Sequence, residues 1–299
     1  MGGERGGINN IPMQKNIKKI AVIGYGYVGK AVVNMFKSHY LVVAKDIDKE
    51  HIFDESEGQI TVSSTEDDYS RINDADLAIV CVPTPMIEGC EDSFKGCDIS
   101  LVEAVVNRLE TPVILIKSTV EPGTTDRLRR QTGKRIVFSP EYAGEGKYWS
   151  PYKFDKDMKE CPFVIMGGPR EDTAYVLDLL VPVLGPKKFY YQIKAKEAEV
   201  VKYMENTYFG MKVTFSNEMK NICDALGVDY YTVRTGWALD PRVDPMHTMV
   251  FPGSPGFGGK CLPKDINGII RASQKAGYDP EFIKEVIRSN DRFKNNKKE

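Results

Sequence analysis

Short apolar runs alternate with amphipathic segments over the first two thirds of the chain. Runs rich in β-branched residues predict strands that are buried on both faces of a sheet. Such runs occupy residues 17–24, 40–46, 75–83, 111–119 and 135–140, with shorter ones at 162–168 and 187–192. Apolar residues at helical spacing predict helices at 27–39, 99–110, 121–133 and 170–184. Strands that alternate with helices predict a mostly parallel sheet with helices on both of its faces.

A different pattern begins at about residue 195. From Val201 to Leu226, eight apolar residues follow one another at steps of three or four, an average of about 3.6, which is the period of an α-helix. Gly227 is a typical helix end. The apolar stripe of this long helix has two interpretations, the core of a helical domain or the interface of a dimer. Shorter helices are predicted at 263–276 and 280–293.

These patterns divide the chain of 299 residues into three predicted segments. Residues 1–16 form a flexible tail, residues 17–194 a sheet domain and residues 195–299 a helical domain. The predicted fold class is α/β, a doubly wound parallel sheet followed by an all-α domain with a long central helix.

Composition excludes several classes of function. The net charge is -1, whereas binding to nucleic acid or to an anionic membrane requires a clustered excess of basic residues. No apolar run reaches the roughly 20 residues that span a bilayer, and the first residues lack the apolar stretch of a secretory signal. The six cysteines form no Cys-x-x-Cys pair, and the three histidines have no metal-ligand spacing. We therefore expect a reduced, cytoplasmic protein that binds no metal.

The sequence GYGYVG, which begins at Gly24, is the first candidate site. It follows a predicted strand and opens a predicted helix, and Asp46 ends the next strand 22 residues later. This is the full context of a Rossmann-like dinucleotide-binding turn. Gly24 permits the tight turn, Gly26 lets the backbone approach a pyrophosphate, and Gly29 lets the helix pack closely on the strand. The Asp46 carboxylate would bind ribose hydroxyls and repel a 2′-phosphate, which favours NAD over NADP, although the nearby Lys45 and Lys49 weaken this preference.

The sequence GFGGKCLPKD is the second candidate site. Glycines bring the backbone close around Cys261, and Pro263 marks the start of a helix. A thiol near a helix N-terminus, between Lys260 and Lys264, is expected to have a lowered pKa and more thiolate. The alternative is a small buried cysteine beside a turn, which is the commoner role of this residue type.

Seven motifs, taken in order along the chain, resemble those of nucleotide-sugar 6-dehydrogenases. They are GYGYVG, CVPTP, KSTVEPGTT, SPEYAGEG, EVVKYMENTYFGMKVTFSNE, DPRV and GFGGKCLPKD. The chain is similar to the UDP-glucose/GDP-mannose dehydrogenase family over residues 18–293. The resemblance implies that a nucleotide sugar, of the UDP-hexose type, is oxidised at its C6 alcohol to a uronic acid. It implies two hydride transfers to NAD, no metal and a homodimer.

The resemblance also implies a covalent mechanism. Cys261 would trap the aldehyde as a thiohemiacetal, and the second hydride transfer would give a thioester that water hydrolyses. Lys202 and Asn206 would supply the cation and the donor that stabilise negative oxygen. These two residues lie at i and i+4 on one face of the long helix. Without the resemblance, that face would be interpreted as exposed to solvent.

Further roles follow from the same resemblance. Thr119 and Asp265 would hold a water molecule, and Glu141 would assist thioester hydrolysis. Glu145 would lie near the cofactor and water. Without the resemblance, the two glutamates would be interpreted as solvated loop carboxylates.

The implied binding residues form two sets. Cofactor contacts are assigned to Gly24, Gly26, Tyr27, Val28, Gly29, Asp46, Thr84, Thr119 and Glu145. Substrate contacts are assigned to Glu141, Lys202, Asn206, Arg242 and Gly258. Arg242 matches an arginine that reaches the sugar nucleotide bound by the neighbouring subunit, so its assignment requires a dimer.

The chain departs from the pattern of the family in three respects. It stops where family members usually continue into a C-terminal UDP-binding domain, so we interpret it as a short form, a truncated form or one part of a split enzyme. Asp244 adds negative charge near the place expected for a diphosphate. Cys90 and Cys97 lie in an insertion after CVPTP and are expected to have no role.

Three hypotheses remain open from the sequence. The first is an NAD-dependent nucleotide-sugar dehydrogenase. The second is an NAD-binding accessory subunit that needs a separate C-terminal partner. The third is a one-step hydroxyacid dehydrogenase of similar architecture. A glycine turn without any ligand is the simplest alternative at Gly24.

Overall fold

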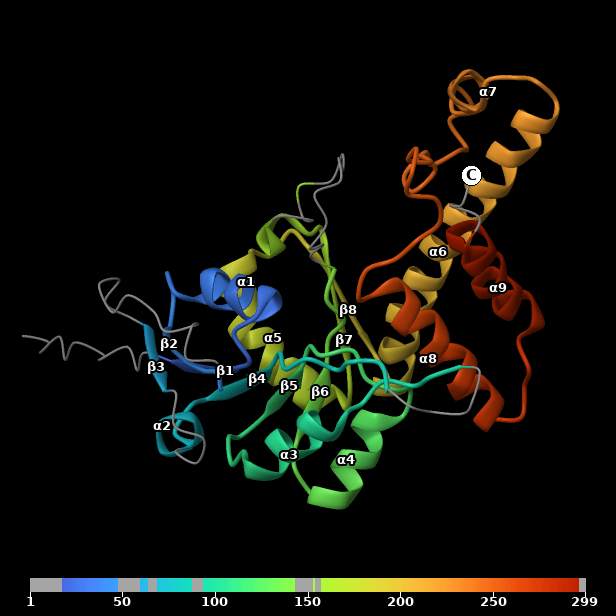
Figure 1. Ribbon diagram of the computed structural model, residues 1–299. Helices are drawn as coiled ribbons and strands as arrows, with labels where there is room; N and C mark the ends of the chain where they lie inside the picture. The colour runs from blue at the N-terminus through green and yellow to red at the C-terminus, as the bar shows by residue number, and fades with distance from the viewer. Residues whose placement is uncertain are drawn as a thin grey trace, which may run out of the picture.

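A computed structural model describes residues 18–47, 60–63, 69–87, 94–142, 153 and 157–295, with the backbone alone at 60–63. Figure 1 shows two parts, a sheet with helices on both faces and a bundle of helices that extends away from it. The predicted tail at 1–16 lies outside the described residues. No helix in the described ranges is both long and apolar enough to cross a membrane.

The described residues form one eight-stranded sheet of order β3-β2-β1-β4-β5-β6-β7-β8. Its strands are β1 (Lys19–Ile23), β2 (Leu41–Lys45), β3 (Ile60–Ser63), β4 (Leu77–Val80), β5 (Ile114–Ile116), β6 (Ile136–Phe138), β7 (Phe163–Gly167) and β8 (Phe189–Ile193). The strands from β3 to β6 are parallel, which confirms the predicted doubly wound sheet. β7 runs antiparallel to β6, and β8 is parallel to β7. The sequence pattern predicts neither β3 nor the direction of β7.

Helices cover both faces of the sheet, as the alternation of elements predicts (Figure 1). They are α1 (Tyr27–Phe36), α2 (Ser70–Asn73), α3 (Ser100–Arg108), α4 (Thr124–Thr132) and α5 (Arg170–Leu184). Alternate residues of a strand face opposite sides. In β1, Ile20 and Val22 pack in the cluster that contains the apolar residues of α1 and α5. Ala21 and Ile23 pack in the cluster on the other face, with α3 and α4.

The helical part is built on one long helix, as predicted. Its elements are α6 (Ala195–Ala225), α7 (Tyr230–Trp237), α8 (Leu262–Lys275) and α9 (Glu281–Asn295). α8 and α9 pack on α6, and Phe257, Ile266 and Val286 form the buried centre of the contact. Gly268 of α8 permits this packing, because a Cβ there would come within 3.0 Å of the Tyr203 ring. α7 was not predicted, although Asp229 caps its first turn by accepting from the Thr232 backbone N–H.

Much of the apolar stripe of α6 faces outward, whereas Met211 and Met219 pack against buried clusters of the helical part. Met204 is 73% exposed and Leu226 is 71% exposed. The buried face of α6 instead carries Tyr203, Asn206 and Gly210, against α8. A helical period identifies a stripe but not the face that other elements cover, and here the covered face is the one with small and polar residues.

Two contacts fix the first turns of α6 against the sheet. Gly167 of β7 leaves room for α6, since a Cβ there would lie 2.6 Å from the Ala198 Cβ. The fully buried Glu199 accepts from the backbone N–H groups of Gly123 (2.5 Å) and Thr125 (2.8 Å) at the start of α4. Burial raises the pKa of Glu199, while these donors favour its ionised form. The loop that carries Thr119 is thereby held against α6.

Candidate functional site

The glycine turn lies between β1 and α1, where the sequence predicts it. Gly24 has a φ of +90°, and a Cβ there would lie 2.7 Å from the backbone carbon of Cys81. Gly29 packs directly against the Gly24 carbonyl. Gly26 begins α1, and a Cβ on it would meet no atom within 4 Å. Two of the glycines are therefore required by packing, whereas Gly26 leaves open space at a helix N-terminus, where a phosphate can approach.

Asp46 faces this turn from the end of β2. Its carboxylate accepts from the Tyr25 backbone N–H at 2.5 Å. Lys45 is only 3% exposed, and its ammonium lies 5.1 Å from the centre of the Tyr69 ring. Because Lys45 is buried there, it is not an exposed cation for a 2′-phosphate. The turn and the acidic side chain fit the pyrophosphate and ribose of NAD.

A pair of alanine variants separates folding from cofactor binding at the turn. Gly24→Ala is expected to destabilise the protein by roughly 2–6 kcal/mol, because it adds backbone strain and a clash with Cys81. Gly26→Ala should leave the free energy of unfolding almost unchanged and weaken NAD binding. Urea denaturation and calorimetric titration with NAD measure the two effects. Equal NAD affinity of Gly26→Ala and the wild type would contradict a cofactor at this turn.

Three predicted residues lie beyond the carboxyl ends of neighbouring parallel strands. Thr84 follows β4 and is buried, Thr119 follows β5 and is half-buried, and Glu141 follows β6. The Glu141 carboxylate forms an ion pair with the Lys117 ammonium at 3.0 Å, and both side chains are nearly buried. The carboxyl edge of such a sheet is where cofactors and substrates bind.

Tyr142 connects this edge to α6. Its backbone N–H donates to the Glu141 carboxylate at 2.8 Å, and the centre of its ring lies 5.4 Å from the Lys202 ammonium. Burial raises the pKa of Tyr142, with a further contribution from the negative charge of Glu205. Glu205 also lies 3.6 Å from Lys202. Tyr142 therefore contacts both predicted residues, Glu141 through its backbone N–H and Lys202 through its ring.

A buried polar cluster connects α6 to the start of α8. The Asn206 amide donates to one oxygen of Asp265 at 2.5 Å, and Lys264 donates to the other at 2.5 Å. Asp265 is 1% exposed. The helix face with Lys202 and Asn206 thus points inward, although periodicity alone predicts a solvated face.

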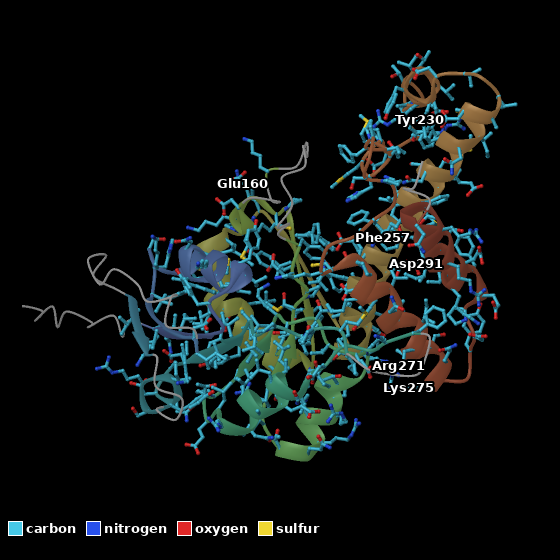
Figure 2. The ribbon with its side chains drawn as sticks, viewed as in Figure 1. Glu160, Tyr230, Phe257, Arg271, Lys275 and Asp291 are labelled. Carbon is cyan, nitrogen blue, oxygen red and sulfur yellow. The ribbon has the colours of Figure 1, made fainter. Side chains whose placement is uncertain are left out.

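Cys261 lies on an exposed turn immediately before α8. Its carbonyl accepts from the Asp265 backbone N–H at 2.9 Å, which joins the cysteine to the buried cluster through one helical turn. The preceding loop is anchored at Phe257, which Figure 2 labels in the helical part. The Phe257 backbone N–H donates to Asn290 of α9 at 2.6 Å. Gly258, the next residue, is exposed.

Other sequence predictions have different outcomes. Arg242 is 87% exposed and pairs with Asp240, so within one chain it stands apart from the cluster. Asp244 pairs with Lys212 at 2.8 Å, which offsets the negative charge that the sequence places there. Glu145 and Cys90 lie outside the described residues.

Cys97 lies in the segment between β4 and α3, as the sequence predicts, but its side chain is buried. It is 3% exposed, and its sulfur lies 3.6 Å from the Tyr203 hydroxyl. Sequence reasoning also missed Lys117 and Glu199. Lys117 stands two residues before Thr119 in KSTVEPGTT, and Glu199 stands three residues before Lys202, so proximity to predicted residues was the available signal.

The doubly wound sheet and its glycine turn define a dinucleotide-binding protein. Family models match in two places, the NAD binding domain of the UDP-glucose/GDP-mannose dehydrogenase family at residues 18–180 and its central domain at 196–292. The chain belongs to the UDP-glucose/GDP-mannose dehydrogenase family, and its sheet domain is an NAD-binding domain.

Individual relatives agree with this assignment. A UDP-N-acetyl-D-mannosamine dehydrogenase of Methanococcus vannielii is 31% identical over 94% of this chain and 66% of its own length. A UDP-glucose 6-dehydrogenase of Haloferax volcanii is 28% identical over 91% of this chain and 69% of its own. A solved UDP-glucose dehydrogenase of Pyrobaculum islandicum has a TM-score of 0.76 and 25% identity, over 94% of this chain and 70% of its own. The chain spans about two thirds of the length of these relatives.

Proposed function

We propose that this protein oxidises the C6 alcohol of a nucleotide sugar to a uronic acid with NAD. The observation that carries the proposal is the buried hydrogen bond between Asn206 and Asp265. It joins the inward face of α6, which carries Lys202, to the helix that Cys261 begins. A thiol, a cation and a fixed amide donor beside a carboxylate are the groups that acyl chemistry on a sulfur requires.

The cofactor would be held at one edge of the sheet. Its pyrophosphate would lie at Gly26 and its ribose at Asp46, with Tyr27, Val28 and Thr84 close to the same turn. Bound NAD supplies the hydride acceptor. Thr119, on the loop after β5, would lie between the cofactor and the substrate.

The residues of the chain act on the sugar carbon. The Cys261 thiolate adds to the carbon of the aldehyde, and after the second oxidation that carbon is held as a thioester. Lys202 and Asn206 stabilise the negative oxygen of the tetrahedral species. Asp265, with Thr119, orients the water that exchanges protons with that oxygen.

The proposed substrate is a UDP-hexose of the UDP-glucose type. Relatives that are named for UDP-glucose and for UDP-N-acetyl-D-mannosamine support the UDP-sugar class and leave the hexose to be tested. The test is incubation of the purified chain with NAD and UDP-glucose, UDP-N-acetylmannosamine or GDP-mannose, followed by mass spectrometry of the product. Formation of a uronic acid supports the proposal. NAD binding without any product would favour the accessory-subunit hypothesis.

We propose also that the exposed stripe of α6 forms a homodimer interface within residues 195–299. Exposed Met204, Tyr208 and Phe215 continue along the helix towards Leu226. An exposed apolar stripe of this length is typical of a protein interface. A partner there would bring Arg242, which stands apart from the cluster in its own chain, towards the substrate of the other subunit.

Phe215→Glu is expected to weaken dimerisation about thirtyfold or more, because interface hot spots contribute about 2 kcal/mol or more. Sedimentation analysis over a range of protein concentrations measures the Kd. Phe282→Glu is the matched control, since Phe282 is 65% exposed on α9, outside the stripe. The interface would be disproved if Phe215→Glu and Phe282→Glu had the same Kd as the wild type.

A further inference from the structure

The ion pair between Lys117 and Glu141 joins the ends of two neighbouring strands. Lys117 follows β5 and Glu141 follows β6, and the Nζ to Oε2 distance is 3.0 Å. Their side chains are only 10% and 12% exposed. The second carboxylate oxygen accepts from the Tyr142 backbone N–H at 2.8 Å. The carboxylate is therefore held at both of its oxygens.

The pair forms part of the wall of a largely apolar pocket on the sheet. Besides the two charged residues, the lining includes Leu115, Phe163 and Leu180. Ion pairs in such surroundings are screened less by water than pairs at an exposed surface. Removal of one member of a buried pair leaves the other charge uncompensated.

Three of the other titratable groups around Glu141 are neutral near pH 7. Burial raises the pKa of Cys81, at the end of β4, to about 12. Burial also raises the pKa of the Cys161 thiol, just before β7, and of the Tyr142 hydroxyl. Lys202 and Glu205 of α6 lie beside the Tyr142 ring. Lys117 forms a direct ion pair with the Glu141 carboxylate.

We infer that Lys117 is a positioning residue that holds Glu141 ionised and oriented for hydrolysis of the thioester on Cys261. The inference rests on the proposed function. In the step concerned, the oxygen of water attacks the thioester carbon and a water proton passes to the Glu141 carboxylate. The C–S bond breaks and its electron pair leaves with the sulfur as the Cys261 thiolate. The step needs no oxidant or reductant.

The inference predicts that removal of Lys117 slows thioester hydrolysis at acidic pH and not at alkaline pH. A cation at 3.0 Å stabilises the carboxylate, so Glu141 stays ionised down to a lower pH than it would without Lys117. When Lys117 is removed, Glu141 becomes protonated at a higher pH. Hydrolysis is then lost at acidic pH and is retained at alkaline pH, where the carboxylate is ionised in either case.

The test follows the decay of the acyl-enzyme directly. Wild type and Lys117→Met are mixed with NAD and the accepted nucleotide sugar, quenched in acid at several times, and the mass of the intact protein is measured at each pH. The decay rate falls below a certain pH, and we call this part of the pH profile the acid limb. In Lys117→Met the acid limb is expected to lie about 1–3 pH units higher. Lys117→Arg, which keeps the cation, should restore the acid limb.

Lys284→Met is the matched control. Lys284 is also 10% exposed and pairs with Asp279 and Glu281 at 2.7 Å, but it lies on α9. It should lower stability without moving the acid limb. An acid limb of Lys117→Met that coincides with the wild type, or rates lowered equally at every pH, would overturn the inference and leave the proposed function intact. Absence of both acyl-enzyme and NADH in the wild type would instead refute the proposed function.

Discussion

Replacement of Cys261 by serine is expected to lower uronic acid formation on the order of 10³-fold or more. Serine has nearly the same size, but its hydroxyl does not ionise near neutral pH and is a far weaker nucleophile. Because Cys261 is exposed on the turn before α8, the substitution should leave the midpoint of urea unfolding unchanged. Steady-state rates and denaturation curves of the same preparation measure both effects.

Cys223→Ser is the control for a general effect of losing a thiol. Cys223 is 3% exposed in a small apolar cluster with Tyr230 and Val250, far along α6. It should lower stability and leave kcat unchanged. Full activity of Cys261→Ser would show that the exposed thiol is not the nucleophile.

Asp265→Asn should impair both catalysis and stability. Asparagine has no negative charge to pair with Lys264. In addition, its NH₂ group is a donor and would face one of the two groups that donate to Asp265, which are Asn206 and Lys264. We expect kcat to fall about 10²–10⁴-fold, the range for loss of a positioned proton-transfer group. The free energy of unfolding should fall by about 3–5 kcal/mol, because a buried ion pair is broken.

Measurements on the folded fraction separate these two losses. Rates are taken at low temperature, where the variant is folded, and stability is measured by urea denaturation. Asp229→Asn is the control, since Asp229 is an exposed cap of α7 and accepts from the Thr232 backbone N–H at 2.7 Å. A kcat of Asp265→Asn equal to that of Asp229→Asn would remove Asp265 from the mechanism.

The fold was predictable where the information is local. The turn from Gly24 to Gly29 and the carboxylate at Asp46 are recognised by their spacing between a predicted strand, a helix and the next strand, and the structure brings them together. The direction of β7 was not predictable, because its antiparallel pairing joins Phe138 and Gly167, which lie far apart in the sequence. The outward face of α6 likewise depends on α8 and α9, which follow much later in the chain.

The candidate site was predictable only in part, for a related reason. Spacing places Lys202 and Asn206 on one helix face, but only the family resemblance indicated that this face points inward. Lys117 and Glu199 act through partners 24 and about 75 residues away, at Glu141 and at the start of α4. No local pattern reports pairs of this kind.

The most direct test of the central claim is the number of NADH molecules formed per molecule of sugar. With the nucleotide sugar limiting and a carbonyl trap present, a thiol that holds the sugar between two oxidations predicts two NADH and no trapped aldehyde. One NADH per sugar, with the aldehyde recovered on the trap, would contradict a covalent role for Cys261.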